Sequence, residues 1–394
     1  MTNQKPIYLL IAHGYPFQKI GGVGQVLAQL VKYLPTLGWD VHLLIPELSR
    51  KNIRPRIVSE TTTWGTLHII HRPVWHWSQA WKDRTTNQIL RQWIANIQPH
   101  TLHIHHLNGL PYQWLIDAKV QHKHLTLHDY ALPCARGQLL DRWFQVCDQP
   151  NPDKCLDCIV GWLVLERQKK QRLAERFTLS TLLLERMNTI DAPSEDLRQR
   201  VQRIYPKVRI DHCDLPIEHR PAIARQPSNQ HRFLFVGSIH PSKGVHLVLQ
   251  SFVRLKDPNV QLTIIGGDGH SDTHPNYPQI WTTFANQSPR IKWLGSMGHD
   301  AVLQAMESHD TLILPSLWPE NSPIVIREAL QQSMKVNCGR GGSVALHQNI
   351  VQLQTISVHA LAVAMKKTFS SPPPKPVRYP PPEQIVTQWI GSPL

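Results

Sequence analysis

Short apolar runs alternate with amphipathic stretches along the first half of the chain. Ile7–Ala12 is continuously apolar, which predicts a buried strand, and the apolar positions between Val26 and Leu34 recur at helical spacing. Further strands are predicted at Val41–Ile45, Thr101–His105, Leu125–Leu127 and Thr189–Ala192, with helices at about 87–96 and 163–186. Strands that alternate with helices favour a parallel sheet built from βαβ units.

The same alternation restarts after residue 230. Predicted strands are Phe233–Val236, Leu262–Ile265, Ile291–Leu294 and Thr311–Leu314, and predicted helices are Val245–Leu255, Ala301–Glu307 and Ile324–Gln331. Two such units in tandem predict an α/β protein with two Rossmann-like domains. Its ligand is expected at the carboxyl ends of the strands, in the interdomain cleft.

The length of 394 residues also favours two domains. We expect a first domain at 1–218 with a cysteine-rich insertion at about 130–160, where the alternation breaks. A polar linker at 219–230 leads to a second domain at 231–370. The tail at 371–394 is proline-rich at first, and its end is expected to form a short helix that docks on the first domain.

Composition narrows the class of partner. Hydrophobic residues make up 41% and charged residues 18%, as in a globular protein, and the formal net charge is +14. Such a charge favours nucleotides, nucleic acid or an anionic membrane as partners. The basic residues are dispersed apart from Glu166–Arg176, and no nucleic-acid motif is present, so no specific nucleic acid is expected.

The location expected from the sequence is the cytoplasm. Ile7–Ala12 is too short for the core of a signal peptide, and no stretch is apolar enough to span a bilayer. Glu166–Arg176 is interpreted as a solvated helix face. A basic helix lying on the cytosolic face of a membrane is the alternative.

Four loops, each after a predicted strand, carry candidate chemistry. The first holds Gly14, Gly21, Gly22 and Gly24 before a helix start, where glycines permit close backbone approach to an anion, although a plain turn explains them nearly as well. The second is His128-Asp129, which is placed to hydrogen-bond a sugar hydroxyl or a phosphate.

The third and fourth loops lie in the second half. Gly237-Ser238 is followed by Lys243 near a helix start, where a lysine can neutralise a diphosphate; a surface lysine is the alternative. Glu320 and Glu328 lie eight residues apart in a largely apolar run, so each acid needs a partner, and a ribose diol suits a carboxylate.

These segments resemble the family-four group of retaining glycosyltransferases with the GT-B fold. The resemblance covers most of the chain and rests on the glycine loop, His128-Asp129, Ala192-Pro193-Ser194, the Gly-x₅-Lys-Gly loop and the Glu-x₇-Glu motif. It implies a catalytic centre at His128, Lys243 and Glu320. It also implies donor contacts from Gly21, Gly22, Gly237, Ser238, Lys243, Asn321, Ser322 and Glu328.

The expected reaction follows from the resemblance. It implies transfer of a hexosyl group from a nucleoside-diphosphate sugar to a hydroxyl of a glycan or lipid-linked acceptor, with retention of configuration and without a catalytic metal. The chain accordingly holds no Asp-x-Asp motif. One rival is another activity on the GT-B fold, a nucleotide-sugar epimerase or a phosphorylase, although the Glu-x₇-Glu motif favours a transferase. The other rival is a catalytically degenerate protein of the same fold that binds glycan or nucleic acid.

Two departures from the family pattern keep this rival open. Ser238 stands where the family usually has arginine, so one expected diphosphate cation is missing. Ser343–Gln348 stands where the family usually has an acidic residue and a glycine-containing loop, and Arg340 is a candidate replacement for the lost cation.

The insertion holds four clustered cysteines, Cys134, Cys147, Cys155 and Cys158. The final C-x₂-C is typical of a zinc knuckle, and four thiolates match a closed structural zinc site. Structural zinc, free thiols and a disulfide stay open as alternatives.

Overall fold

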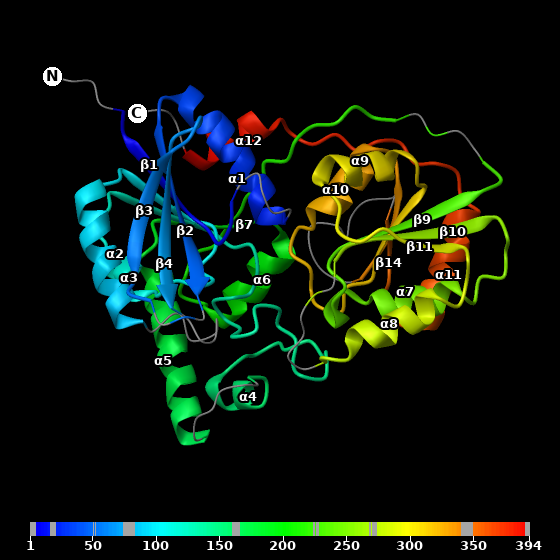
Figure 1. Ribbon diagram of the computed structural model, residues 1–394, viewed down its shortest axis with the longest axis horizontal. Helices are drawn as coiled ribbons and strands as arrows, with labels where there is room; N and C mark the ends of the chain where they lie inside the picture. Colours follow the sequence, from blue (N-terminus) through cyan, green and yellow to red (C-terminus); the bar gives the residue numbers. More distant parts are fainter. Residues whose placement is uncertain are drawn as a thin grey trace. The chain divides into compact units, whose positions relative to one another are not determined.

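The computed structural model describes residues 5–15, 21–49, 51, 53–73, 83–159, 166–223, 225, 228–267, 269, 274–339 and 350–390. The chain divides into two compact units (Figure 1). Unit 1 comprises Met1–Leu139, Asp148–Glu218 and Pro380–Leu394, and unit 2 comprises Leu140–Cys147 and His219–Tyr379. Three boundaries therefore differ from the sequence prediction: residues 140–147 of the insertion belong to unit 2, the predicted linker at 219–230 belongs to unit 2, and unit 2 runs to Tyr379 rather than to residue 370.

Unit 1 is built on an eight-stranded sheet in the order β3-β4-β2-β1-β5-β6-β7-β8. All neighbouring strands run parallel except the antiparallel pair β3 and β4. The strands are β1 (Ile7–Ile11), β2 (Asp40–Ser49), β3 (Arg56–Thr61), β4 (Thr66–Pro73), β5 (Thr101–Ile104), β6 (His122–Thr126), β7 (Thr189–Ala192) and β8 (Asp211–His212). The helices are α1 (Gly22–Tyr33), α2 (Arg84–Ile97), α3 (Gln113–Asp117), α4 (Pro152–Leu156), α5 (Glu166–Glu185), α6 (Glu195–Ile204) and α12 (Pro382–Ile390).

The apolar patterning of unit 1 explains most of these elements. In α1 the buried apolar residues are Val26, Leu27, Leu30 and Val31, which lie on the predicted face. The hairpin of β3 and β4 was not predicted. β3 is a largely exposed edge strand without an apolar run, whereas β4 is buried from Leu67 to Ile70 and its apolar residues were overlooked.

Strand β6 lies earlier than predicted, and its sequence explains the error. His122–Thr126 is mostly polar, yet Lys123 and His124 are buried in it. Lys123 Nζ donates to the carbonyl oxygens of Leu115 and Ile116, and His124 Nε2 lies 2.7 Å from Asp191 Oδ2. Buried polar groups with partners are tolerated in a core, but they hide a strand from a hydrophobicity pattern.

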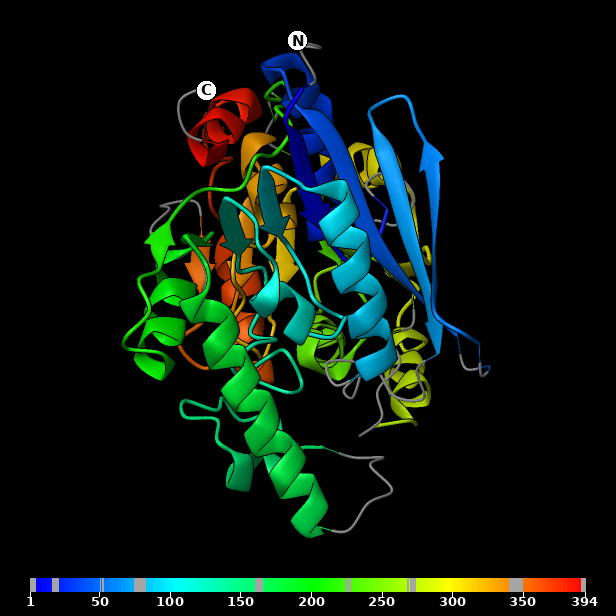
Figure 2. The ribbon, with the colours of Figure 1, turned by 90° about the vertical axis from the view of Figure 1, so that its left-hand side faces the viewer.

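Helix α5 extends away from the sheet of unit 1, and α4 lies beside it (Figure 2). A small apolar cluster of Ala135, Cys155, Ile159 and Leu173 holds this part of unit 1 together. Arg176, at the end of the basic stretch, is buried and donates to the carbonyl oxygens of Ala131 and Leu132. This arginine therefore has a structural role and is not part of a solvated face.

Unit 2 contains a six-stranded parallel sheet in the order β11-β10-β9-β12-β13-β14. The strands are β9 (His231–Val236), β10 (Val260–Ile265), β11 (Ile291–Trp293), β12 (Thr311–Leu314), β13 (Lys335–Cys338) and β14 (Ile350–Gln352). The helices are α7 (Val245–Phe252), α8 (Tyr277–Ala285), α9 (His299–Glu307), α10 (Ile324–Gln331) and α11 (Val358–Phe369). One apolar core joins the sheet to these helices, with Phe233, Leu312 and Leu361 among its fully buried members.

The C-terminal helix α12 packs against α1 in unit 1. Ile385, Val386 and Trp389 are its buried apolar residues. The proline-rich segment before it has no helix or strand, and Pro382 stands at the first position of α12, where a missing N–H costs nothing.

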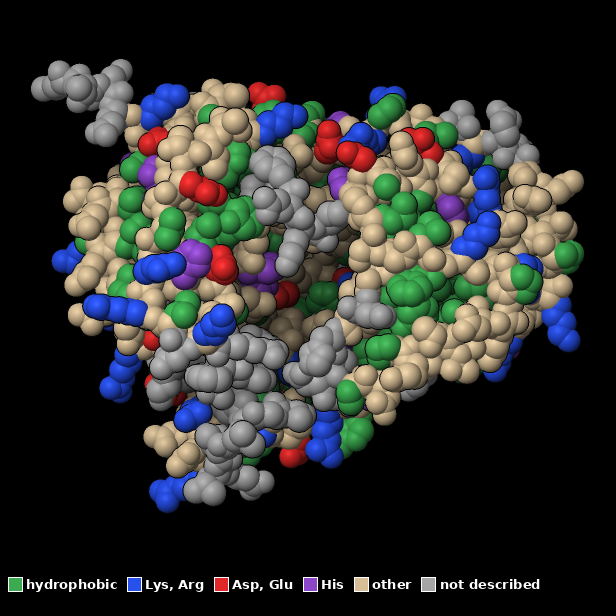
Figure 3. Space-filling model, in the orientation of Figure 1, with side chains coloured by type: hydrophobic (Ala, Val, Ile, Leu, Met, Phe, Trp, Pro, Cys, Tyr) green, Lys and Arg blue, Asp and Glu red, His purple; other side chains and the backbone are tan. Residues whose placement is uncertain are grey.

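Two surface properties bear on partners. Lys and Arg side chains are scattered among other side chains on the face shown in Figure 3, rather than gathered in one stripe. Within the described parts of the chain, no helix combines the length and the apolar character needed to cross a membrane.

Candidate functional site

In unit 2, the loops at the carboxyl ends of β9, β10 and β12 pack closely on one another. A Cβ at Gly266 would lie 1.9 Å from the carbonyl oxygen of Gly237, and a Cβ at Gly244 would lie 2.5 Å from that of Pro315. Gly244 also has φ +71°, a conformation that glycine adopts at low cost. These glycines let three loops share one edge of the sheet, where parallel α/β sheets bind ligands.

Lys243 and Glu320 meet at this edge. Lys243 ends the short 3₁₀ helix Pro241–Lys243 after β9, and its Nζ lies 2.7 Å from Glu320 Oε1 in the loop after β12. Ser316 Oγ donates to the same oxygen at 2.5 Å, and the ring centroid of Trp318 lies 5.1 Å from Lys243 Nζ. A partly buried ammonium and a buried carboxylate are thus held together, which suits the binding of a ligand with both phosphate and hydroxyl groups.

Glu328 occupies a second position at the same edge. It lies in α10, is buried, and accepts a hydrogen bond from His299 Nε2 at 2.6 Å. His299 is the first residue of α9, after β11. The sequence interpretation missed this histidine, although its place at a helix start after a strand is the signal that singled out the other loops.

The other predicted donor contacts lie nearby in the chain. Asn321 and Ser322 are buried in the loop that carries Glu320. Ser238 is exposed, and its carbonyl oxygen accepts a hydrogen bond from His240 N. Arg340 and Ser343–Gln348 lie outside the described residues, so the proposed replacement of the missing cation rests on sequence alone.

The carboxyl edge of the unit 1 sheet has a different chemistry, dominated by imidazoles. His13 follows β1, His106 follows β5, and their ring centroids are 4.0 Å apart. His106 Nε2 lies 2.8 Å from Asp129 Oδ2, and His128 Nε2 lies 3.0 Å from His105 Nδ1. The predicted His128-Asp129 pair is therefore part of a cluster at this edge.

The protonation of this cluster follows from its burial. Burial lowers the pKa of His128 to about 3, with a further contribution from the nearby His106. Burial opposes ionisation of Asp129, but the His106 contact and the N–H of Ala131 outweigh it, so the pKa of Asp129 is lowered. At neutral pH the edge presents an uncharged His128 beside an ionised Asp129, a combination that can accept and donate hydrogen bonds to hydroxyl groups.

Gly21 and Gly22 lie at the start of α1. Gly21 is the N-cap residue, and a Cβ there would meet no described atom within 4 Å. Packing of the described residues therefore does not require glycine at position 21, which is compatible with close approach of a ligand.

A buried polar stack lies in the sheet behind the unit 1 edge. The rings of His103 and His124 are parallel, with centroids 3.8 Å apart, and Trp389 of α12 lies 5.4 Å from His103. His103 contacts Tyr8 Oη at 3.0 Å and Thr126 Oγ1 at 2.8 Å. The sequence interpretation did not identify this stack, because its members come from three separate strands and the C-terminal helix.

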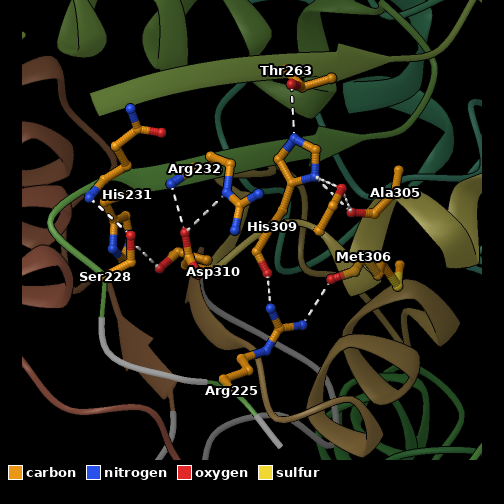
Figure 4. Close-up of polar contacts among 12 residues, drawn as sticks. Arg225, Ser228, His231, Arg232, Thr263, Ala305, Met306, His309 and Asp310 are labelled. Atoms are coloured by element: carbon orange, nitrogen blue, oxygen red, sulfur yellow. Dashed lines mark hydrogen bonds and ion pairs between the residues drawn. The ribbon is translucent and has the colours of Figure 1, made fainter. Parts of the chain in front are cut away.

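A second set of polar contacts lies near the amino ends of the unit 2 strands (Figure 4). Asp310 Oδ2 accepts a hydrogen bond from Arg232 N at 2.7 Å, and His309 Nε2 lies 2.8 Å from Thr263 Oγ1. Arg225, from the predicted linker, donates to the carbonyl oxygens of Met306, His309 and Gln332. This network ties the linker to unit 2, and we assign it a structural role.

The four clustered cysteines differ in burial and in the unit to which they belong. Cys134 and Cys155 are buried, and Cys155 packs in the apolar cluster between α4 and α5. Cys147 belongs to unit 2, whereas the other three belong to unit 1. Among the described residues, no group of three or more His, Cys, Asp or Glu side chains is placed to hold a metal ion. Structural zinc stays a prediction from the spacing.

Comparison with known families decides the class of the protein. Residues 20–213 match the family model described as Glycosyltransferase Family 4, and residues 217–345 match the model described as Glycosyl transferases group 1. The chain belongs to this family of glycosyltransferases. It is therefore an enzyme that transfers a glycosyl group, and its fold is GT-B, with two parallel-sheet units.

Solved structures with the same fold span almost the whole chain. Sucrose-phosphate synthase from Thermosynechococcus elongatus has a TM-score of 0.67 at 14% identity, covering 98% of this chain and 95% of that chain. A UDP-forming trehalose-phosphate synthase from Burkholderia xenovorans has a TM-score of 0.61 at 13% identity, with coverages of 94% and 92%. Starch synthase IV from Arabidopsis thaliana, bound to ADP and acarbose, has a TM-score of 0.61 at 13% identity, with coverages of 98% and 95%. No curated protein sequence matches the chain significantly.

Proposed function

We propose that this glycosyltransferase moves a hexosyl group from a nucleoside-diphosphate sugar to a hydroxyl of a glycan or lipid-linked saccharide, with retention of configuration. The observation that carries the proposal is the meeting of Lys243 and Glu320 at 2.7 Å, on loops that follow β9 and β12. Solved structures of the same fold include a UDP-forming synthase and a starch synthase bound to ADP, which supports a nucleoside-diphosphate donor.

Each residue of the unit 2 edge has a role in this proposal. Lys243 neutralises the diphosphate, Glu320 accepts hydrogen bonds from hydroxyls of the donor sugar, and Glu328 accepts them from the ribose diol. Asn321 and Ser322 offer backbone N–H groups to the donor. In the described structure Lys243 and Glu320 compensate each other, so a bound donor has to compete with Glu320 for the ammonium.

The unit 1 edge is proposed to meet the acceptor and the transferred sugar, with Gly21 and Gly22 near the donor and His128 near the reacting carbon. The bond between the anomeric carbon and the diphosphate breaks, and a bond to the acceptor oxygen forms on the same face of the sugar. The departing phosphate oxygen takes the proton of the acceptor hydroxyl. Lys243 stabilises the negative charge that develops on the diphosphate.

A release assay tests this function. Purified protein is incubated with a panel of sugar nucleotides and saccharide acceptors, and free nucleoside diphosphate is measured. We expect turnover with one donor, a loss of about 100-fold in Lys243→Ala, and a loss of about 10-fold to 100-fold in Glu320→Gln. Lys292→Ala and Glu307→Gln, at exposed positions of unit 2, serve as matched controls and should keep full activity.

Two results would count against the proposal. Turnover that survives in both site variants would place the chemistry elsewhere. Absence of turnover and of donor binding across the panel would indicate that the loss of the usual arginine at Ser238 abolishes donor binding. It would then favour the catalytically degenerate protein that only binds glycan or nucleic acid.

We also propose contact with an anionic membrane, which rests on the basic stretch in α5. This stretch presents less positive charge to a membrane than its sequence suggests, because Arg176 is buried and Lys170 pairs with Asp153. Sedimentation with vesicles that contain an anionic phospholipid tests the contact. Failure of the protein to sediment with the vesicles at both low and high salt would exclude it.

A further inference from the structure

The carboxylate of Glu328 is already held by a side chain that the proposed donor site does not use. Glu328 has a side-chain exposure of 7%, and its Oε1 lies 2.6 Å from Nε2 of His299. Because an ionised carboxylate only accepts hydrogen bonds, Nε2 must carry the proton in this contact. The contact fixes which way the carboxylate faces, and a carboxylate has enough lone pairs to accept a ribose diol as well.

Burial makes this contact important for Glu328. A buried carboxylate without a partner is costly, and a charged partner offsets that cost. His299 has an exposure of 26%, so it lies at the boundary between the buried acid and solvent. Its position at the start of α9 brings it to Glu328 from a different element, 29 residues away in the chain.

Among the described residues, the other charged groups that act on His299 are Arg220 and Asp300. Arg220 Nη2 lies 3.3 Å from Asp300 Oδ1, and both act on His299 electrostatically. The hydrogen bond with Glu328 is the largest influence and raises the pKa of His299. Burial and Arg220 act in the opposite direction, and Asp300 supports the increase. His299 is thus able to carry a positive charge beside Glu328 under mildly acidic conditions.

A nucleoside diphosphate brings further negative charge to this edge of the sheet. Glu328 alone would repel it, whereas an imidazolium paired with Glu328 would cancel that repulsion. We propose that His299 is the positioning residue of the nucleotide subsite, where it orients the Glu328 carboxylate and offsets its charge when a nucleoside diphosphate binds. The proposal rests on the function proposed above, and it adds a dependence of donor affinity on pH.

The sign of the pH dependence follows from linkage. An anionic ligand favours the protonated form of His299, so nucleotide affinity should fall as the pH rises and His299 loses its proton. Each unit by which the bound ligand raises the pKa of His299 corresponds to a tenfold change in affinity across the titration.

Calorimetric titration with UDP, ADP and GDP, between about pH 6 and about pH 9, tests the inference. His299→Gln keeps a hydrogen-bond donor but no charge. We expect it to match the wild type near pH 9 and to bind the preferred nucleotide about tenfold more weakly near pH 6. His299→Ala should bind more weakly at both pH values, because Glu328 loses its partner. Comparison at the same pH cancels the titration of the nucleotide itself.

Two controls make the result specific. His359→Gln, at an exposed position of α11, should behave as the wild type. Glu328→Gln should lower nucleotide affinity and, in an NMR titration of the imidazole signals, return the pKa of His299 toward its ordinary range. Circular dichroism and thermal unfolding establish that each variant is folded.

The outcomes separate this inference from the proposed function. If Glu328→Gln loses affinity while both His299 variants bind as the wild type at every pH, the role of His299 is refuted and the donor site stands. If the wild type binds none of the three nucleotides, the proposed function fails and this inference with it. An unchanged pKa of His299 in Glu328→Gln would refute the pairing itself, independently of any ligand.

Discussion

The carboxyl edges of the two sheets both hold polar clusters, but the chemical groups in them differ. The unit 1 edge gathers His13, His105, His106 and His128 around Asp129, and burial keeps His128 uncharged at neutral pH. The unit 2 edge holds the Lys243–Glu320 pair and Glu328 with His299. Neutral imidazoles suit hydroxyl groups, whereas an ammonium suits a diphosphate, so the contrast supports a division between a saccharide side and a nucleotide side.

The largest expected effect that tests this contrast is acid destabilisation of unit 1. Burial holds the pKa values of His103 and His105 well below 6.5, lowers that of His68 to about 4, and lowers that of His128 to about 3. The stability that depends on their neutral form is complete above about pH 6.5. It is lost as the pH falls below that value, because the unfolded chain then binds protons that the folded chain does not. Each such histidine costs about 1.4 kcal/mol one pH unit below 6.5.

Among the described residues, unit 2 contains fewer histidines of this kind, and they include His231 and His246, whose pKa values burial lowers to about 4. Hydrogen exchange read by mass spectrometry, corrected for intrinsic rates, should therefore show unit 1 losing protection at a higher pH than unit 2. Peptides from unit 2 in the same sample provide the internal control. Simultaneous loss of protection in both units, or earlier loss in unit 2, would contradict the prediction.

The second prediction concerns Trp389, whose indole packs on the histidine stack. Trp389→Ala removes a buried aromatic ring in contact with His103, His105 and His124, so unit 1 should lose about 3 kcal/mol of unfolding free energy. Denaturant unfolding followed by hydrogen exchange measures the loss. Leu182→Ala, at an exposed position of α5 in the same unit, should change stability by less than about 0.5 kcal/mol. If Trp389→Ala lost as little unfolding free energy as we expect for Leu182→Ala, the Trp389 ring would not stabilise unit 1.

The third and smallest expected effect is that of His128→Asn, a change at the unit 1 edge, on turnover and on nucleotide affinity. His128→Asn keeps a hydrogen-bonding partner for His105 but loses the imidazole. Turnover should fall about tenfold, as for one hydrogen bond near the reacting centre, while calorimetric affinity for the nucleoside diphosphate stays unchanged. His212→Asn, on the exposed strand β8, is the matched control. A parallel loss of nucleotide affinity would place His128 on the donor side and remove the contrast.

The sequence predicted those parts of the fold that depend on apolar periodicity. Strands β7 and β12 and helix α10 have the predicted bounds, and α1 buries the predicted face. Strand β6 was placed too late, and β3, β4, β8, β13 and β14 were missed. β3 and β6 have too few apolar residues to reveal them, and their stability comes from polar partners or from pairing at a sheet edge. β4 is buried from Leu67 to Ile70, so its apolar residues were a signal that the sequence prediction overlooked.

The candidate site was predictable where a residue lies in a short motif. Lys243, Glu320 and Glu328 have diagnostic spacing, and the structure brings Lys243 and Glu320 into contact. His299 was not predicted. Its place at a helix start after a strand was a usable signal, but its contact with Glu328, 29 residues away in the chain, is seen only in the structure. The same reason explains why the stack of Tyr8, His103, His124 and Trp389 was invisible in the sequence.

The sequence by itself determined the α/β class, the tandem sheets and the loops that carry the chemistry, because periodicity and glycine placement act over a few residues. Only the tertiary structure decided the charge state and the partners of those loops. The imidazole of His128 is neutral because burial disfavours its charged form. The buried carboxylate of Glu328 has a hydrogen-bond partner because His299 lies at the start of α9, next to it. Desolvation and ion pairing depend on three-dimensional neighbours, which residue spacing does not encode.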